Sequence, residues 1–412
     1  MRSYQDLFRT PEFTPLFLSS ALQSAGQTVG GLATGTLVYA ATDSPLLSAV
    51  SMFTPQLAQV LGATTLLSAA DRVPPRAALA GIALAYGLGT AVLAVPGLPV
   101  RAVFPVILLL GLIASLGGGV RWGLLNEILA NDGYLLGRSV FNMMSGLMQV
   151  TGFATGGVLV AVLSPRAALL LAALLYLLSA LGTRLGLAAR PPRASGRPSV
   201  AVTWRTNALL WSDRARRLTY LGLWLPNGLV VGCESLFVAY DPGSAGTLFA
   251  AAASGMLVGD VTVGRLVSVG VRQRLATPLL LLLAGPYLLF ALNPSTPVAA
   301  VAAALASVGF GASLVQQERL MALTPDELSG HALGLHSAGM LTMQGVAATL
   351  AGSVAQLTSP ATAMAVMAGA SAALTLTLAA TARRPVPEPQ PAQAVSAARS
   401  REGWRRRVRT PD

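Results

Sequence analysis

Apolar segments long enough to cross a membrane recur along almost the whole chain, and each ends at glycine, proline or charged residues. A spanning helix needs about 20 mostly apolar residues, so 412 residues leave room for twelve such helices with short connections. Only 11% of the residues are charged, against about 25% in an average soluble domain. The sequence therefore predicts an all-α polytopic membrane protein with twelve transmembrane helices. The predicted spans are 14-41, 45-69, 76-95, 102-125, 138-163, 166-188, 217-240, 243-268, 275-292, 297-317, 330-356 and 360-382.

The arginines test this count, because the cytoplasmic loops of membrane proteins collect basic residues. The chain carries 28 Lys+Arg, and every one of them is arginine. With twelve spans and a cytoplasmic N-terminus, only Arg101 and Arg166 lie outside. The distribution predicts a multi-pass plasma-membrane protein with both termini in the cytoplasm.

The charge pattern divides the chain into five predicted regions. Residues 1-13 form a cytoplasmic segment, 14-188 and 217-382 form two six-helix bundles, 189-216 form a basic linker, and 383-412 form a disordered cytoplasmic tail. The arginines of the linker and tail could bind anionic lipids at about 1 kcal/mol per charge. Because the basic charge follows the topology, it does not predict nucleic-acid binding.

An internal repeat supports two pseudo-symmetric halves. Met148-Gln149, Gly157 and Ser164-Pro165 recur as Met343-Gln344, Gly352 and Ser359-Pro360, always with the same displacement. Transporters built from two such halves bind their substrate between them, near the middle of the bilayer. The repeat therefore predicts a site between the halves.

Three short motifs lie at the ends of predicted spans, and a fourth lies within the fifth span. They are Leu7-Phe8-Arg9-Thr10-Pro11-Glu12-Phe13, Asp71-Arg72-Val73-Pro74-Pro75-Arg76, Arg121 with Asn126-Glu127, and Gly152 to Gly157. With these motifs the chain resembles, up to about Arg384, the major facilitator superfamily, in particular bacterial drug and siderophore exporters of the macrolide-efflux or enterobactin-exporter type. The resemblance implies a two-bundle transporter fold. It also implies that the Asp-Arg loop belongs to a cytoplasmic charge cluster that holds the outward-open state, and that the fifth-span glycines are typical of exporters. Phe153 stands where exporters usually have proline, which leaves the direction of transport open.

Two acidic residues lie inside predicted spans, where a carboxylate is costly unless it is paired or protonated. Glu234 is the stronger candidate for a proton-coupling site, because proton coupling needs a carboxyl whose protonation changes with access. The alternative is a carboxyl near the outer mouth that is solvated or hydrogen bonded. Asp260 is the second candidate, and an ion pair with Arg265 is its alternative role.

Polar and aromatic side chains at similar depth predict the substrate-binding surface. Such groups either line a cavity or form hydrogen bonds between helices. The predicted substrate-binding residues are Gln23, Gln27, Asn142, Gln149, Trp224, Asn227 and Gln344.

Charged residues at the cytoplasmic ends of spans two to five predict a gate. Ion pairs that form in one conformation and break in another can act as a two-state latch. The predicted gate residues are Asp71, Arg72, Arg76, Arg121 and Glu127. The alternative is that these charges only set the topology.

These features predict a monomeric secondary transporter that exports a small amphiphilic molecule, such as a drug, siderophore or secondary metabolite, in exchange for protons. Without any lysine the chain cannot form the usual phosphate-binding loop for ATP, so the energy must come from a gradient. We expect no cofactor and no metal, because the single cysteine, Cys233, has no neighbouring ligand set. An importer on the same fold is the first alternative, and an intramembrane lipid-modifying enzyme is a remote one.

Overall fold

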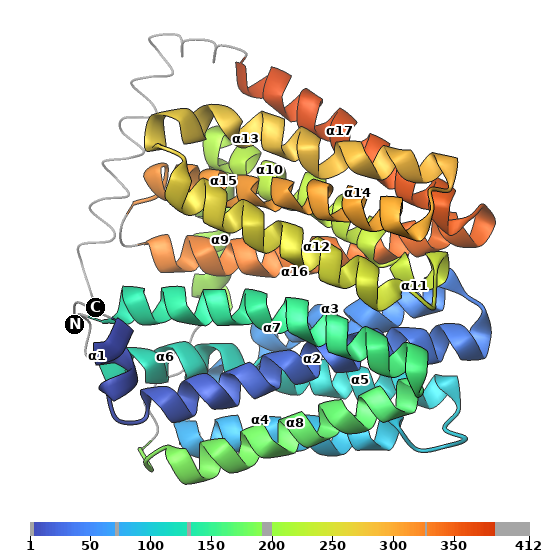
Figure 1. Ribbon diagram of the computed structural model, residues 1–412. Helices are drawn as coiled ribbons and strands as arrows, with labels where there is room; N and C mark the ends of the chain where they lie inside the picture. The colour runs from blue at the N-terminus through green and yellow to red at the C-terminus, as the bar shows by residue number, and fades with distance from the viewer. Residues whose placement is uncertain (1–3, 71–73, 130–132, 192–199, 326–327, 384–412) are drawn as a thin grey trace, which may run out of the picture.

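Long helices dominate the computed structural model, which describes residues 4–70, 74–129, 133–191, 200–325 and 328–383 (Figure 1). The regular structure of these described residues is entirely helical. Within them, nine helical segments are long and apolar enough to cross a membrane. The all-α prediction is confirmed, and the number of crossings stays a prediction.

The first half of the molecule is built around α2. Its helices are α1 (Tyr4–Arg9), α2 (Phe13–Thr42), α3 (Pro45–Ala70), α4 (Pro75–Leu93), α5 (Val100–Ala114), α6 (Gly117–Leu129), α7 (Tyr134–Val162) and α8 (Pro165–Gly186). Helix α2 packs against α7 and α8, α4 packs against α8, and α3 packs against α5. Figure 1 shows this half in blue to green, with α1 and the N-terminus at the left-hand end.

The second half is built around α10. Its helices are α10 (Arg214–Glu234), α11 (Phe237–Tyr240), α12 (Ala245–Val261), η1 (Thr262–Leu266), α13 (Val269–Ala284), η2 (Gly285–Leu292), α14 (Thr296–Val308), η3 (Gly309–Gly311), α15 (Ala312–Ala322), α16 (Ser329–Leu357) and α17 (Pro360–Arg383). Helix α10 packs against α16 and α17, and α12 packs against α14. The yellow to red helices of Figure 1 belong to this half.

Several predicted spans are not continuous helices. The span at 102-125 divides between α5 and α6, and the span at 297-317 contains the 3-10 turn η3. At Gly309 the backbone lies against α13, and an added Cβ would stand within 2.5 Å of the Leu283 nitrogen. Only glycine permits this approach, so the local break follows from tertiary packing.

The predicted linker contains a helix that the sequence did not predict, α9 (Val200–Ser212). Its Trp211 stacks on Trp224 of α10, with the ring centroids 5.5 Å apart. Asn207 of α9 also lies 2.9 Å from His331 of α16 through its amide oxygen. These contacts attach α9 to the second half.

The two halves meet along two helix pairs, α3 with α16 and α7 with α12. Glycines of the internal repeat lie in both contacts. A Cβ on Gly157 would stand 2.5 Å from Cα of Gly246, and one on Gly352 would stand 2.7 Å from Cα of Leu46. The repeat therefore marks two equivalent close approaches between the halves.

The repeated Ser-Pro pairs begin equivalent helices. The Ser164 hydroxyl accepts a 3.1 Å hydrogen bond from the Ala167 amide at the start of α8. The Ser359 hydroxyl accepts one of the same length from the Thr362 amide at the start of α17. Serine caps the first turn, and the following proline loses nothing there because its missing N–H would have no helical partner.

Candidate functional site

Arg121 of α6 lies well inside the first half and bonds to an amide. Its Nη2 donates a 2.8 Å hydrogen bond to the side-chain oxygen of Gln23 in α2. Gln23 is buried, about 15 Å along α2 from Phe13 at about 1.5 Å per residue. The two residues were predicted for different roles, Arg121 for the gate and Gln23 for substrate binding. The structure brings them together at one point.

The other predicted gate residues have separate partners. Arg76 donates to the backbone oxygen of Leu187, at 3.2 Å. Glu127 lies 3.6 Å from Nε of Arg190, which is a residue that the sequence analysis did not select. Asp71 and Arg72 lie outside the described residues.

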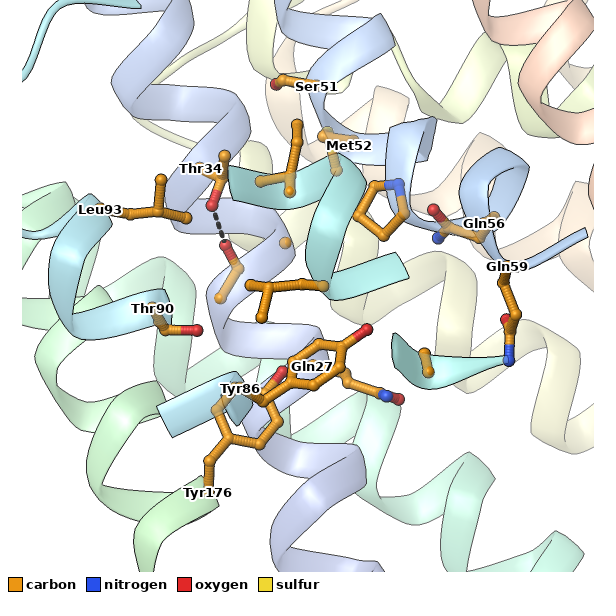
Figure 2. Close-up of a pocket in the computed structure, with 16 residues that line it drawn as sticks. Gln27, Thr34, Ser51, Met52, Gln56, Gln59, Tyr86, Thr90, Leu93 and Tyr176 are labelled. Atoms are coloured by element: carbon orange, nitrogen blue, oxygen red, sulfur yellow. Dashed lines mark hydrogen bonds between the residues drawn. The ribbon is translucent and has the colours of Figure 1, made fainter. Parts of the chain in front are cut away.

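A cavity of about 170 Å³ lies among the helices of the first half (Figure 2). It is midway along the helices, and α2, α3, α4, α5 and α8 all contribute to its wall. Its lining residues are Gln27, Gly30, Gly31, Thr34, Ser51, Met52, Pro55, Gln56, Gln59, Tyr86, Thr90, Leu93, Ile107, Leu110, Ala114 and Tyr176. Of the predicted substrate-binding residues, only Gln27 is among them.

Tyrosines are the main polar groups of this cavity that the sequence analysis missed. Tyr86 comes from α4 and Tyr176 from α8, and their ring centroids are 5.1 Å apart. Figure 2 shows both rings reaching the cavity beside Gln27. The sequence did contain a signal for these two residues, because each tyrosine interrupts an otherwise aliphatic predicted span.

Glu234 ends α10 and is half-buried among groups of the second half. Its Oε1 accepts hydrogen bonds from the Ser307 hydroxyl of α14, at 3.3 Å, and from the Tyr287 hydroxyl of η2, at 3.5 Å. Cys233 beside it is fully buried and bonds to backbone oxygens. The carboxyl therefore has neutral donors around it, an arrangement that both a proton site and a hydrogen-bonded structural carboxyl would show.

Trp224 and Asn227 of α10 point to different neighbours. Trp224 donates from Nε1 to the backbone oxygen of His336 in α16, at 3.1 Å. Asn227 is buried and donates to the Ser313 hydroxyl of α15, at 3.3 Å, while its Oδ1 has no partner in the described part of the chain. The two side chains thus take part in contacts inside the second half.

The remaining predicted site residues lie on the helices where the halves meet. Asn142 and Gln149 belong to α7, Gln344 to α16 and Asp260 to α12. The side chain of Asp260 is exposed, and its role as a second proton-coupling acid stays a prediction. The sequence placed Asp260 correctly within an apolar helix, but which face of the helix is covered depends on how the helices pack.

Contacts between the halves that the sequence did not reveal lie near the short connections 43–44 and 358–359. The Ser44 hydroxyl donates to the Gln356 side-chain oxygen at 2.9 Å, and the Tyr39 hydroxyl lies 3.4 Å from the Ala239 oxygen. Phe153 stacks on Phe249 with the ring centroids 4.7 Å apart. These contacts join the two halves near one end of the molecule.

The described residues contain no group of three or more His, Cys, Asp or Glu that could hold a metal ion. No family model matches the chain, and no curated protein matches it in sequence.

Two helical halves joined along α3–α16 and α7–α12 form the fold of major facilitator transporters. Solved structures match it over most of their length. A POT family transporter in complex with a thioalcohol-conjugated peptide is 11% identical, with 90% of this chain and 95% of that chain covered and a TM-score of 0.71. The nucleoside transporter NupG is 15% identical, with 89% and 98% covered and a TM-score of 0.71. A peptide transporter POT in complex with sulfate is 14% identical, with 93% and 98% covered and a TM-score of 0.71.

At such identities the likeness shows the fold. It does not support the drug and siderophore exporter type that the motifs suggested, since these structures are named as peptide and nucleoside transporters.

Proposed function

We propose that the protein is a secondary transporter that moves a small molecule across a membrane by alternating access. The observation that carries this proposal is the contact between the halves, where Gly157 meets Gly246 and Gly352 meets Leu46. Small residues at such contacts let helices approach closely and leave little side-chain interlocking, so that one half can rock against the other. The likeness in fold to peptide and nucleoside transporters supports the same function.

The arginines favour one orientation in the membrane. We define the arginine-rich end as the end of the molecule that carries Arg76, Arg190, Arg216 and Arg272, whereas Arg101 and Arg166 lie at the opposite end. Basic residues collect on the cytoplasmic side, so we assign the arginine-rich end and both termini to the cytoplasm of the plasma membrane. The Ser44–Gln356 bond then closes the outer end, which corresponds to a conformation facing inward.

Glu234 is the proton-coupling residue in this proposal. Its partners Tyr287 and Ser307 are neutral hydroxyls, which can donate to the carboxylate and accept from the carboxylic acid. Loss and gain of a proton therefore need no rearrangement of an ion pair. Gln23 and Arg121 in the first half, with Asn142, Gln149 and Gln344 on the interface helices, are proposed to contact the substrate.

Two directions of transport are compatible with this proposal. The fifth-span glycines favour export of an amphiphilic compound in exchange for protons. Import on the same fold is the second version, and it fits the named peptide and nucleoside transporters at least as well. In everted vesicles, an exporter accumulates its substrate on energisation, and an importer does not.

The test uses purified protein in liposomes under an imposed proton gradient, with labelled dialanine, uridine and ethidium as probes. We expect at least one probe to move with the gradient in the wild type, and Glu234→Gln to abolish the dependence on the gradient while exchange continues. Glutamine retains an oxygen for Tyr287 and Ser307, so the variant should fold. Asp260→Asn, at the second candidate acid, is measured beside it, and loss of coupling in that variant alone would assign the proton site to Asp260 instead of Glu234.

If folded wild-type protein moves no probe in either direction, the transporter proposal fails. If Glu234→Gln remains coupled, Glu234 is a structural carboxyl.

A further inference from the structure

The cavity of the first half contains polar groups that no protein group satisfies. The hydroxyls of Tyr86 and Tyr176 and the amides of Gln27 and Gln59 form no hydrogen bond within the described part of the chain, and the same holds for the Thr90 hydroxyl. Tyr86, Thr90 and Tyr176 are 7%, 4% and 3% exposed, so lipid or bulk water is not their general environment. Buried polar groups normally have partners, and for Tyr86, Thr90 and Tyr176 the cavity is the space that can supply them, whereas Gln27 is exposed and Gln59 is half-buried.

Other lining groups already have partners. The Thr34 hydroxyl donates to the Gly30 oxygen at 2.7 Å, and the Ser51 hydroxyl donates to the Ser48 oxygen at 2.7 Å. In the orientation that satisfies its amide, Gln56 donates to the backbone oxygens of Met52 and Phe53. The unsatisfied groups are thus a specific subset: two phenols, one hydroxyl and two amides.

Another part of the cavity wall is apolar. Leu93, Ile107 and Leu110 are buried, and with Ala114 and Pro55 they form a surface without hydrogen-bonding side chains. The lining residues include no Asp, Glu, Arg or His. A charged ligand would have no counter-charge there and would lose its hydration, so the chemistry selects an uncharged molecule.

The size of the cavity suits about one ring. A dry apolar cavity of about 150 Å³ in another protein holds benzene, and this cavity measures about 170 Å³. Offset aromatic contacts with the two tyrosines favour a flat ring, and their hydroxyls favour a hydroxyl or carbonyl substituent.

We propose that this cavity binds an uncharged, single-ring compound with a hydroxyl substituent, either alone or as the ring of a larger molecule. The ring packs between the tyrosines and the wall of Leu93, Ile107 and Leu110, while the hydroxyl bonds to Tyr86, Tyr176 or a glutamine. That this ligand is transported rests on the proposed function, whereas its binding does not.

Glycines provide a matched pair of variants for the test. Gly31 of α2 lines the cavity, and a Cβ built there meets nothing within 4 Å. Gly81 of α4 also has free space at its Cβ but does not line the cavity. Gly31→Leu should fill the cavity, and Gly81→Leu applies the same change to a helical glycine elsewhere.

The experiment measures p-cresol binding to purified protein in detergent by ligand-observed NMR, with toluene as the analogue without a hydroxyl. Partition into micelles is the same for all variants, so differences report the protein. We expect p-cresol to bind the wild type more tightly than toluene, Gly31→Leu to weaken binding at least about tenfold, and Gly81→Leu to leave it within about twofold. One hydrogen bond is worth about a fivefold change in affinity. Tyr86→Phe and Tyr176→Phe should therefore each weaken the binding of p-cresol by about that factor and leave the binding of toluene unchanged.

The proposal is overturned if p-cresol does not bind the wild type, if Gly31→Leu binds p-cresol with the same affinity as the wild type, or if toluene binds the wild type as tightly as p-cresol does. Should Gly31→Leu fail to fold, the two phenylalanine variants decide, because each removes one oxygen atom from an otherwise unchanged cavity. Binding of p-cresol by a protein that moves no probe in liposomes would support the cavity and contradict the transporter function, so the two failures are distinct.

Discussion

The guanidinium of Arg190 holds the carboxylate of Glu12 with two hydrogen bonds, of 2.6 Å from Nη1 and 3.0 Å from Nη2. The amide of Ala188 donates a third, at 3.0 Å, to the same carboxylate. Glu12 has φ of 68° at the turn before α2, a conformation that is unfavourable for a residue with a Cβ. The pair thus fixes a strained turn and joins the start of α2 to the chain that leaves α8.

Replacing Arg190 by glutamine should destabilise the first half. The change removes the two-bond pair with Glu12 and the 3.6 Å contact with Glu127. The side chains of Arg190 and Glu12 are 27% and 19% exposed, so we expect a loss of about 1 kcal/mol. Thermal unfolding in detergent measures it. Arg184→Gln, which removes an exposed arginine of the last turn of α8, is the control of equal charge, and an equal loss in both variants would refute the role of the pair.

Acid should remove the same stabilisation. Burial would raise the pKa of Glu12, but the hydrogen bonds from Arg190 and the Ala188 amide outweigh it and hold the pKa below its usual value of 4.5. A carboxyl with a lowered folded-state pKa stabilises the fold above its unfolded-state pKa and ceases to do so as the pH falls through the folded-state pKa. The difference in unfolding free energy between the wild type and Glu12→Gln should be constant above about pH 5 and shrink below about pH 4.5. A difference that does not depend on pH would contradict this assignment.

Adding a methyl group where the halves meet should impair their contact. In Gly157→Ala and Gly352→Ala the new Cβ would stand 2.5 Å from Cα of Gly246 and 2.7 Å from Cα of Leu46, so a backbone must move. Such overpacking costs about 1 to 3 kcal/mol. Unfolding temperature and transport rate should both fall in these variants. Gly369→Ala, whose Cβ meets nothing within 4 Å in α17, should be neutral or slightly stabilising.

The two serine caps should contribute equally. Ser164→Ala and Ser359→Ala each remove a 3.1 Å bond to the first turn of a helix, in α8 and α17. We expect each to cost about 1 kcal/mol of unfolding free energy, with the double variant close to the sum because the sites lie in different halves. Denaturant titration tests this. If one serine alone mattered, the repeat would not reflect equivalent structure.

The helices were predictable because the bilayer imposes length and apolarity on each spanning segment. The breaks were not, because they depend on partners far along the chain, as Gly309 depends on α13. The sequence did not predict α9 for a similar reason. This helix is held by the stacking of Trp211 on Trp224 of another helix, and not by a periodic apolar face of its own.

The sequence predicted how deep in the membrane the candidate site residues lie, but it did not predict which side chains they contact. Glu234 was selected from its place in an apolar span, yet its partners Tyr287 and Ser307 come from other helices. Gln23 and Arg121 were assigned to separate functions until the structure brought them within 2.8 Å. Helical periodicity gives the face of a residue on its own helix, and only the packing of helices decides what that face meets.

Contacts with the two halves hold both ends of the connection between them. Arg190 is fixed to the first half at Glu12, and α9, which begins at Val200, is fixed to the second half through Trp211. The chain between Arg190 and Val200 can reach at most about 35 Å when fully extended, at about 3.5 Å per residue. The length of this connection therefore sets an upper limit on how far the two halves can separate at the arginine-rich end during transport.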